Sequence, residues 1–194
     1  MGKVKAEKIK EFFKNLDRRV FMETQLDYAD EDRPLSIGQG QTISQPSLVL
    51  EMTLLLELTS DSKVLEVGTG SGYQTAFLAE FAEEVYTIER IEALYNTCIK
   101  RYENLAYDNV HFVQGDGSKG LEEYAPYDRI IVTAASPRNP EILLEQLKKG
   151  GRLVVPIGSG TIQELCVFEK DTSGEVTKNF IEYVQFVPLV SEDQ

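Results

Sequence analysis

The segment Lys63–Tyr73, KVLEVGTGSGY, decides the fold of this chain of 194 residues. Apolar residues surround Glu66 in its first half, and three glycines follow at alternate positions, Gly68, Gly70 and Gly72. Glycine adopts backbone conformations that other residues avoid, and it lets a ligand lie against bare main chain. A helical pattern follows at once, and the N-terminus of a helix offers unpaired N–H groups. The segment therefore predicts a strand, a glycine turn and a helix that together bind a nucleoside cofactor.

Two classes of nucleoside cofactor bind to glycine turns of this kind. A dinucleotide loop requires G-x-G-x-x-G, whose third glycine allows the helix to pack closely on the strand. Here the third glycine comes one residue early, at Gly72, and Tyr73 occupies the position where the dinucleotide motif has glycine. The run E-x-G-x-G-x-G resembles instead the loop of S-adenosylmethionine-dependent methyltransferases. In that case Glu66 accepts a hydrogen bond from the cationic amine of the cofactor, directly or through water.

The composition is that of a globular protein with an acidic surface. Hydrophobic residues make up 42% of the chain, which suits a buried core. There are 32 acidic and 20 basic residues, and the resulting charge of −12 argues against nucleic acid or an anionic membrane as the main partner. The sequence contains no apolar run of the roughly 18 residues that a membrane span needs. Its two cysteines are too few for a disulfide framework or a zinc site. We expect a monomeric, cytoplasmic protein without a metal.

Strand and helix patterns alternate after the glycine turn. Beyond the turn, strands are expected at 84–89, 109–114, 128–134 and 152–157. Helices are expected at 76–82, 91–105 and 141–149, the last ended by Gly150 and Gly151. This alternation predicts an α/β fold with a doubly wound, mostly parallel Rossmann-like sheet. The β-rich segments 162–169 and 176–187 predict antiparallel strands at its C-terminal edge.

The residues before the glycine turn predict two helices and a loop. An amphipathic helix is expected over 3–16, and a second helix over 48–58. Pro46 suits the first turn of the second helix, where a missing N–H costs nothing. The glycine-rich segment 34–41 is expected to be irregular. We expect a single domain, with N-terminal helices and a substrate-side loop in 1–58, a cofactor-binding core in 59–158 and a β edge in 159–194.

Three acidic residues fall at the ends of three successive predicted strands. Besides Glu66, Glu89 follows Gly68 by 21 residues, a spacing at which a carboxylate reaches the ribose hydroxyls. Asp116 lies between two glycines, where its carboxylate can accept from an adenine amino group. Strand-end acids are commonly solvated or cap the next helix, but three in succession favour a cofactor site. Its expected residues are Glu66, Gly68, Thr69, Gly70, Ser71, Gly72, Glu89, Arg90, Asp116 and Gly117.

The chain lacks an evident general base. Its only histidine, His111, lies inside a predicted strand, and we expect it to be structural. Cys98 falls on the core face of a predicted helix and Cys166 in the middle of a strand, so both are expected to be structural. Methylation of carbon, amines or hydroxyls often needs a base, whereas a carboxylate is already ionised at neutral pH. The enzyme then needs only to align the carboxylate with the methyl group and to exclude water.

Segments over about residues 34–190 closely resemble the protein-L-isoaspartate O-methyltransferases. They are IGQGQTISQP (37–46), VLEVGTGSGYQTAFLAE (64–80), VYTIER (85–90), GDG (115–117), APYDRIIVTAA (125–135), GGRLVVPIG (150–158) and FVPLV (186–190). The glycine turn marks only the methyltransferase superfamily, whereas GQTISQP and FVPL are far more specific to this family.

The resemblance implies an enzyme that methyl-esterifies the abnormal α-carboxylate of isoaspartyl residues in damaged proteins and peptides. The methyl donor is S-adenosyl-L-methionine and the product S-adenosyl-L-homocysteine; the ester then collapses to a succinimide, which allows partial return to aspartate. The resemblance also implies that Ser44 is the active-site residue and orients the substrate carboxylate. The other implied substrate contacts are Thr42, Ile43, Thr133, Ala134 and Ala135. From spacing alone, Thr42 and Ser44 fit equally well as caps of the helix that begins near Pro46.

The sequence departs from the family pattern in two places. Many members have histidine where this chain has Ser47, and the N-terminal region is shorter than usual, although Arg18–Phe21 resembles the segment before the family motif. Three alternatives therefore stay open. They are a methyltransferase that acts on a small molecule, a module that binds the cofactor without turnover, and an NAD-dependent oxidoreductase. The TISQP segment counts against the first, and Tyr73 against the last.

Overall fold

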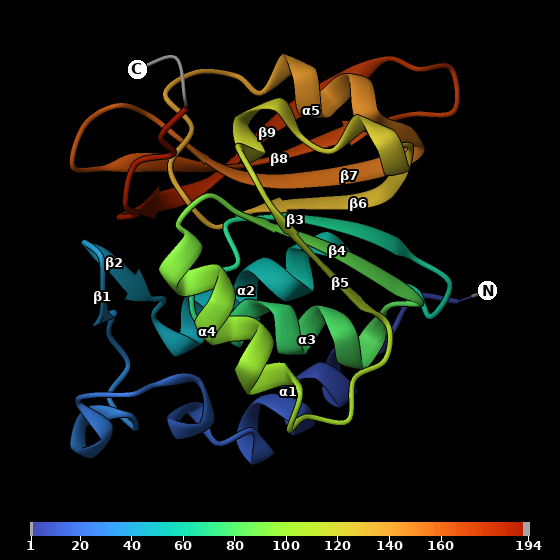
Figure 1. Cartoon of the computed structure of the whole chain (residues 1–194). Coiled ribbons are helices and arrows are strands. Elements are labelled where there is room, and N and C mark those ends of the chain that lie inside the picture. Colours follow the sequence, from blue (N-terminus) through green and yellow to red (C-terminus); the bar gives the residue numbers. More distant parts are fainter. Residues whose placement is uncertain (1, 192–194) are drawn as a thin grey trace.

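A seven-stranded sheet forms the centre of the computed structural model, which describes residues 2–191 (Figure 1). The strand order is β5-β4-β3-β6-β7-β8-β9. The strands are β3 (Lys63–Val67), β4 (Glu84–Glu89), β5 (Val110–Gln114), β6 (Tyr127–Val132), β7 (Leu147–Ile157), β8 (Gln163–Lys170) and β9 (Val176–Val184). Neighbours from β5 to β7 pair in parallel, and β8 and β9 are antiparallel. This confirms the predicted doubly wound sheet with an antiparallel C-terminal edge.

The direction of the strand order reverses at β3. From β3 the chain proceeds outward to β4 and β5 and then returns to β6 on the other side of β3. Val67 at the end of β3 is the partner of Val132 at the end of β6, and the next N–H, that of Thr133, donates to the Val67 carbonyl at 2.9 Å. Ligands of doubly wound sheets bind where the strand order reverses, beyond the carboxyl ends of the strands.

Helices cover both faces of this sheet. Figure 1 shows α1–α4 below it and α5 above it. The helices are α1 (Ala6–Asn15), α2 (Pro46–Leu56), α3 (Tyr73–Phe81), α4 (Glu92–Tyr102) and α5 (Glu141–Gln146). Single turns of 3₁₀ helix lie at Arg18–Phe21, Leu26–Tyr28, Gly117–Lys119 and Glu122–Tyr124. The amphipathic helix expected over 3–16 is α1, which buries Ile9.

The C-terminal end of α2 is fixed by residues distant in the sequence. Pro46 occupies its first turn, as predicted. At the C-terminal end, the guanidinium of Arg129 donates to the Glu57 carbonyl, and that of Arg152 donates to the Leu55 carbonyl at 2.9 Å. Cations stabilise the carbonyl end of a helix dipole. The helix therefore holds a defined position relative to β6 and β7.

The prediction of irregular structure over 34–41 is wrong. These residues belong to an antiparallel hairpin of β1 (Leu35–Gly38) and β2 (Gln41–Ile43). Leu35 and Ile43 are partners in this hairpin, and both are 1% exposed. Gly38 and Gly40 have positive φ angles of 85° and 70°, which suit a turn between two short strands. This buried pair anchors the open end of the hairpin in the core.

The helix predicted over 141–149 ends three residues earlier than expected. α5 stops at Gln146, and β7 begins at Leu147, before the two glycines. Leu147 is 2% exposed and belongs to the core. The Gln146 carboxamide accepts from the Leu121 N–H at 2.8 Å and donates to the Lys119 carbonyl at 2.9 Å. Leu147 and Gln146 thus make tertiary contacts that a local sequence pattern does not reveal.

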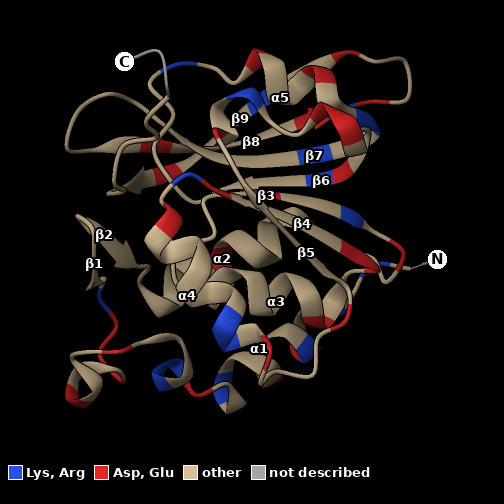
Figure 2. Ribbon diagram, in the orientation of Figure 1, with Lys and Arg blue, Asp and Glu red and all other residues tan. Residues whose placement is uncertain are grey.

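The surface charge is mixed. Figure 2 shows the positions of Lys and Arg scattered among those of Asp and Glu.

In the part of the chain that the structure covers, no helix is both long and apolar enough to cross a membrane.

Candidate active site

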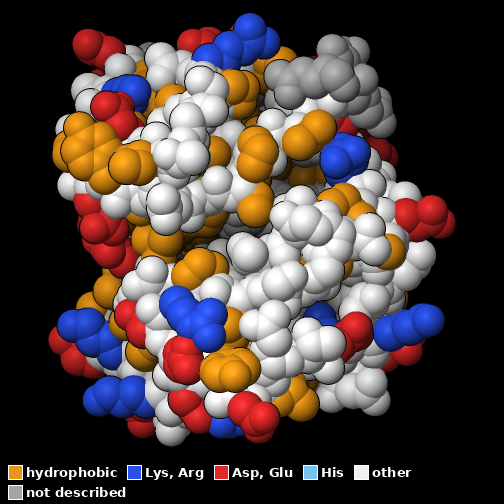
Figure 3. All heavy atoms as spheres, turned by 90° about the vertical axis from the view of Figure 1, so that its left-hand side faces the viewer, with side chains coloured by type: hydrophobic (Ala, Val, Ile, Leu, Met, Phe, Trp, Pro, Cys, Tyr) orange, Lys and Arg blue, Asp and Glu red, His pale blue; other side chains and the backbone are white. Residues whose placement is uncertain are grey.

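A cavity lies beyond the ends of β3, β4 and β6, where the strand order reverses. It is bounded by the glycine turn, by residues of the β2–α2 connection and by the C-terminal segment Val187–Val190. Figure 3 shows this side of the molecule hollowed, with hydrophobic side chains inside the hollow. The predicted site residues that line the cavity are Thr42, Ser44, Gly68, Thr69, Gly70, Ser71, Glu89, Arg90, Gly117, Thr133 and Ala134.

The glycine turn lies directly against the end of β6. Gly68 and Gly70 have φ angles of +97° and +52°. A Cβ atom at Gly68 would be 2.5 Å from the Thr133 hydroxyl oxygen, and that hydroxyl donates to the Gly68 carbonyl. Only glycine combines this backbone conformation with this close approach. The main chain at Gly68 and Gly70 therefore borders the cavity with no side chain in front of it.

The carboxylate of Glu89 connects the turn to the start of α4. One of its oxygens accepts from the Gly70 N–H at 2.9 Å, and the other accepts from the Ile91 N–H at 2.8 Å. The residue is 7% exposed and lines the cavity. Each carboxylate oxygen has a further lone pair with which to accept a hydrogen bond. An anchored carboxylate with spare acceptor capacity suits recognition of adjacent hydroxyl groups.

Glu66 lies beneath the turn and does not reach the cavity. Its side chain is fully buried, and the hydroxyls of Thr75 and Thr87 both donate to one carboxyl oxygen at 2.6 Å. Burial raises the pKa of Glu66 to about 8, although the two threonine hydrogen bonds act in the opposite direction. Thr87 also bonds to Thr69, a residue of the turn, at 2.6 Å. The predicted direct contact with a cofactor amine is thus corrected, because the carboxyl instead supports the turn from below.

Gly72 also packs inward instead of facing the cavity. A Cβ atom there would lie 2.7 Å from both the Cys98 sulfur and the Tyr102 ring. The Tyr102 hydroxyl donates to the Gly72 carbonyl at 2.7 Å, and the guanidinium of Arg101 donates to the Ser71 carbonyl at 2.6 Å. Sequence periodicity placed Tyr102 on the apolar face of its helix but gave no sign of this bond. α4 therefore holds the end of the glycine turn through two side chains.

The side chain of Asp116 caps a short helix. Its carboxylate accepts from the Ser118 N–H at 2.9 Å, which is the capping role weighed for strand-end acids. Gly117 lines the cavity, but Asp116 is not among the lining residues. A Cβ atom at Gly117 would be 2.5 Å from a methyl group of Val67. The contact of Asp116 with adenine stays a prediction, whereas the need for glycine at 117 has a steric cause.

The Ser44 hydroxyl makes no hydrogen bond to any residue within 2–191. Spacing allowed it, or Thr42, to cap α2, but Asp32 takes that role. The Asp32 carboxylate accepts from the Ser47 N–H at 2.9 Å and from the Gln45 side chain at 3.1 Å. The bond from the Ser47 N–H is the main reason why the pKa of Asp32 is lowered. Ser44 is therefore available to a ligand in the cavity.

Arg18 organises the main chain around Ser44, and sequence reasoning missed it. The residue is 5% exposed, and its burial lowers the pKa of the guanidinium. The guanidinium donates to five main-chain carbonyls at 2.9–3.4 Å, those of Ala29, Glu31, Arg33, Ile43 and Ser44. Its only signal was the resemblance of Arg18–Phe21 to a family segment, which does not show where the guanidinium lies.

Two of the predicted substrate contacts, Ile43 and Ala135, do not line the cavity. Ile43 is 1% exposed and packs in the core, so its side chain does not face the cavity. Ala135 binds the C-terminal segment, because its N–H donates to the Val187 carbonyl and its carbonyl accepts from the Leu189 N–H, both at 2.8 Å. This segment closes one wall of the cavity. A contact of Ile43 or Ala135 with the substrate stays a prediction.

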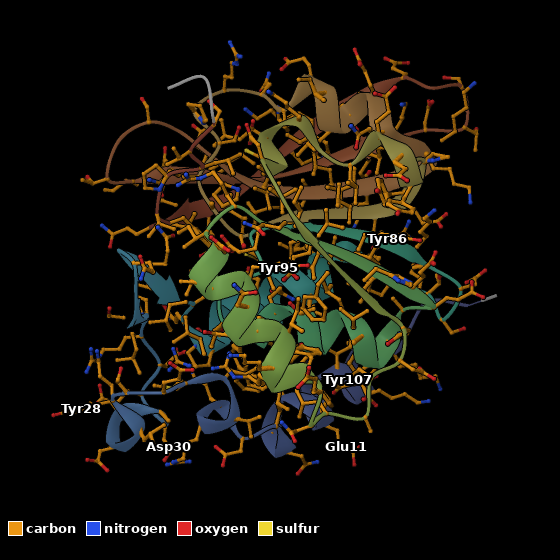
Figure 4. All side chains as sticks on the ribbon, viewed as in Figure 1. Glu11, Tyr28, Asp30, Tyr86, Tyr95 and Tyr107 are labelled. Carbon is orange, nitrogen blue, oxygen red and sulfur yellow. The ribbon has the colours of Figure 1, made fainter. Side chains whose placement is uncertain are left out.

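None of the three residues predicted to be structural, His111, Cys98 and Cys166, lines the cavity. His111 is in the edge strand β5, and its ring stacks on that of Tyr86 with centroids 4.7 Å apart. Figure 4 shows Tyr86 toward the end of the sheet opposite the β1–β2 hairpin. Cys98 and Cys166 are both buried free thiols. Among the described residues, no group of three or more His, Cys, Asp or Glu side chains is arranged to hold a metal ion.

Comparison with known proteins identifies the family. The family model for protein-L-isoaspartate(D-aspartate) O-methyltransferase (PCMT) matches residues 1–194. A protein-L-isoaspartate O-methyltransferase of Dictyoglomus turgidum is 50% identical over 97% of this chain and 86% of its own length. Protein-L-isoaspartate O-methyltransferase 2 of Syntrophobacter fumaroxidans is 55% identical over 84% of this chain and 66% of its own length. A solved protein-L-isoaspartate O-methyltransferase superposes with a TM-score of 0.80 at 29% identity, covering 95% of this chain and 65% of that one. The chain belongs to the protein-L-isoaspartate(D-aspartate) O-methyltransferase family.

Proposed function

We propose that this protein methylates the free carboxylate of isoaspartyl residues in damaged proteins and peptides, and that Ser44 holds that carboxylate. The observation that carries the proposal is the position of Ser44. Its hydroxyl has no partner among residues 2–191, and it lines the same cavity as the glycine turn. The main chain of Ser44 is fixed by Arg18, so the hydroxyl has a defined place before substrate binds.

The cavity has the features that S-adenosylmethionine requires. The turn formed by Gly68, Thr69, Gly70 and Ser71 presents bare main chain at its edge, and Glu89 is the acceptor for the ribose hydroxyls. Arg90 and Gly117 complete the lining on the side of β4 and β5. When bound, the cofactor supplies an electrophilic methyl group on a sulfonium. The residues of this chain bind it, orient it and keep water away.

The acceptor carboxylate needs no general base. It is ionised at neutral pH, so no proton has to be removed before its oxygen attacks the methyl carbon. Ser44 donates a hydrogen bond to the carboxylate, while Thr42, Thr133 and Ala134 line the wall around it. The segment Val187–Val190 covers the site with mostly apolar side chains. Exclusion of water strengthens the attraction between the carboxylate and the sulfonium.

Radiolabel transfer tests the proposal. We expect label to pass from S-adenosylmethionine to an isoaspartyl peptide as a base-labile ester, and the matching aspartyl peptide to stay unlabelled. Equal labelling of the two peptides, or labelling of neither while S-adenosylhomocysteine binds, would overturn the substrate assignment and favour a small-molecule acceptor. A calorimetric titration with S-adenosylhomocysteine and with NAD distinguishes the methyltransferase from the oxidoreductase alternative.

We also propose that the protein acts as a monomer in the cytoplasm, without a nucleic acid partner. The charge of −12 supports the last part, because it opposes binding to a polyanion. Light scattering coupled to size exclusion is expected to give the mass of one chain at micromolar concentration. A doubled mass would contradict the proposal.

A further inference from the structure

A second cavity, of about 430 Å³, shares Thr42 and Ser44 with the cavity at the glycine turn. It lies between the first half of α2 and the end of β9. We call it the groove and define it by Leu48, Glu51, Ile162, Glu182, Tyr183 and Phe186. Because Ser44 belongs to both cavities, a substrate carboxylate held there leaves the rest of its chain beside the groove.

Part of the groove wall is apolar and exposed. The exposed fractions of Ile162 and Tyr183 are 60% and 68%, which is large for such side chains, and Phe186 and Leu48 lie beside them in the same groove. Figure 3 shows hydrophobic and acidic side chains exposed together on this side of the molecule. An exposed apolar patch beside a candidate active site indicates contact with a ligand.

The polar part of the groove is acidic. Glu51 comes from α2 and Glu182 from β9, and both line the groove. Burial and the proximity of Glu182 raise the pKa of Glu51. Neither residue forms an ion pair within the described part of the chain, and no Lys or Arg lines the groove. A cation placed between the two carboxyl groups would let both ionise.

We infer that the groove receives the side chain of a lysine or arginine that flanks the isoaspartyl residue in the substrate chain. The inference rests on the proposed function, since Ser44 determines where the substrate chain enters. The aliphatic part of Lys or Arg packs on apolar surface while its charged end stays polar, and the groove offers both environments. The groove is opposite in charge to that cation, and Glu51 and Glu182 supply the hydrogen-bond acceptors.

The dimensions of α2 agree with this inference. Pro46 and Glu51 are five residues apart in the helix, a rise of about 7.5 Å. An extended peptide advances about 3.3 Å per residue. Ser44 lies two residues before this helix and lines the groove together with Glu51, so the side chain of a basic residue about two positions from the isoaspartate is within reach of Glu51.

Peptides with a systematic change of flanking charge test the inference. Each isoaspartyl peptide carries Lys, Ala or Glu at one position, from two before to two after the isoaspartate. The kcat/KM for methylation is measured, together with peptide affinity by fluorescence anisotropy in the presence of S-adenosylhomocysteine. The test variant is Glu51→Gln with Glu182→Gln. The matched control is Glu7→Gln with Glu11→Gln, which removes two exposed carboxylates from α1 (Figure 4).

We expect the Lys peptide to exceed the Glu peptide by about tenfold in kcat/KM at one flanking position at least. The ratio should fall below about threefold in the groove variant and stay unchanged in the α1 control. If the Lys-to-Glu ratio of kcat/KM is the same in the groove variant and in the α1 control, the overall negative charge of the protein attracts the peptide. That result would overturn the inference. No charge preference in the wild type would also overturn it. If no peptide is methylated while the Lys peptide still binds through Glu51 and Glu182, the proposed function fails and the groove remains supported.

Discussion

The guanidinium of Arg18 donates to the main-chain carbonyl of Ser44 at 2.9 Å, although 26 residues separate the two in the sequence. The same guanidinium binds carbonyls of the loop that carries Asp32 and of the hairpin strand β2. Asp32 in turn accepts from the first turn of α2. The segment with the candidate catalytic hydroxyl is therefore held on one side by the buried guanidinium of Arg18 and on the other by the exposed carboxylate of Asp32.

Replacing Arg18 by lysine tests this positioning role. An ammonium keeps the charge but cannot donate to five carbonyls at once, so Ser44 loses its fixed main chain. We expect kcat/KM for an isoaspartyl peptide to fall by about tenfold or more, the effect of one charge-assisted hydrogen bond. Affinity for S-adenosylhomocysteine should stay within about twofold, since the hydrogen bonds of Arg18 go to the segments around Ser44 and not to the glycine turn.

Arg19→Lys is the matched control for that variant. Arg19 is exposed and pairs with Asp17 and Asp30 on the surface, where ion pairs contribute little. Its kcat/KM should equal that of the wild type. If Arg18→Lys weakens cofactor and peptide equally, Arg18 acts on overall stability and the specific positioning role is wrong.

Ser44→Ala is expected to impair methylation without affecting the cofactor site. The lost hydrogen bond to a charged carboxylate corresponds to about 1.5–3 kcal/mol, or roughly a 10- to 150-fold fall in kcat/KM. Calorimetry should give an unchanged affinity for S-adenosylhomocysteine. A large loss of that affinity would place Ser44 in the cofactor site instead.

Tyr102→Phe is expected to weaken cofactor binding from a distance. The change removes one of two donors to the Gly72 carbonyl, which keeps its bond from the Ala76 N–H, so we expect a loss of about 0.5–1.5 kcal/mol in unfolding free energy. Because Gly72 ends the glycine turn, affinity for S-adenosylhomocysteine should fall by about threefold or more. Tyr107→Phe provides the control, since Tyr107 packs near Tyr102 and its hydroxyl has no hydrogen bond to residues 2–191 (Figure 4). Equal affinities in the two variants would contradict this role for Tyr102.

Glu66 should make stability depend on pH. Its pKa is about 8 in the folded protein, against 4.5 for an unperturbed glutamate. Between these values the folded state keeps a proton that the unfolded state has lost. The contribution of Glu66 to stability is therefore complete below about pH 4.5, and it is lost as pH rises toward 8. The slope can reach about 1.4 kcal/mol per pH unit.

Glu66→Gln removes this slope, because the amide keeps an acceptor for Thr75 and Thr87 and does not titrate. Urea unfolding at pH 5, 6.5 and 8 measures the effect. We expect the variant to gain stability relative to the wild type at each step upward in pH. A difference between the two proteins that is independent of pH would show that the carboxyl is ionised throughout.

The sequence predicted the parts of the fold that depend on local patterns. β4 was expected at 84–89 and has those bounds, because its burial is continuous and an acidic residue stands at each end. The glycine turn was equally readable, since its conformation needs glycine itself. Pro46 marked the start of α2, because its ring and its missing N–H restrict proline to the first turn of a helix.

The remaining features depend on contacts between distant segments. Glu66 was expected at the cavity because it is charged and near a strand end, but β3 is buried on both faces, so its side chain is enclosed. Arg18 binds carbonyls in three segments that no spacing rule connects. The boundary between α5 and β7 depends on the use of Gln146 by another loop. In each case the partner lies far away in the sequence.

The C-terminal segment imposes a practical constraint on how the protein is handled. Val190 lines the cavity and is followed by a single further described residue, Ser191. The N-terminal end lies on the other side of the molecule, where Lys3 bridges to Thr59 (Figure 1). An affinity tag or surface attachment fused after Gln194 would therefore begin only four residues after Val190, which lines the cavity, so we expect it to slow the entry of peptides. The same fusion before Met1 would leave that approach free.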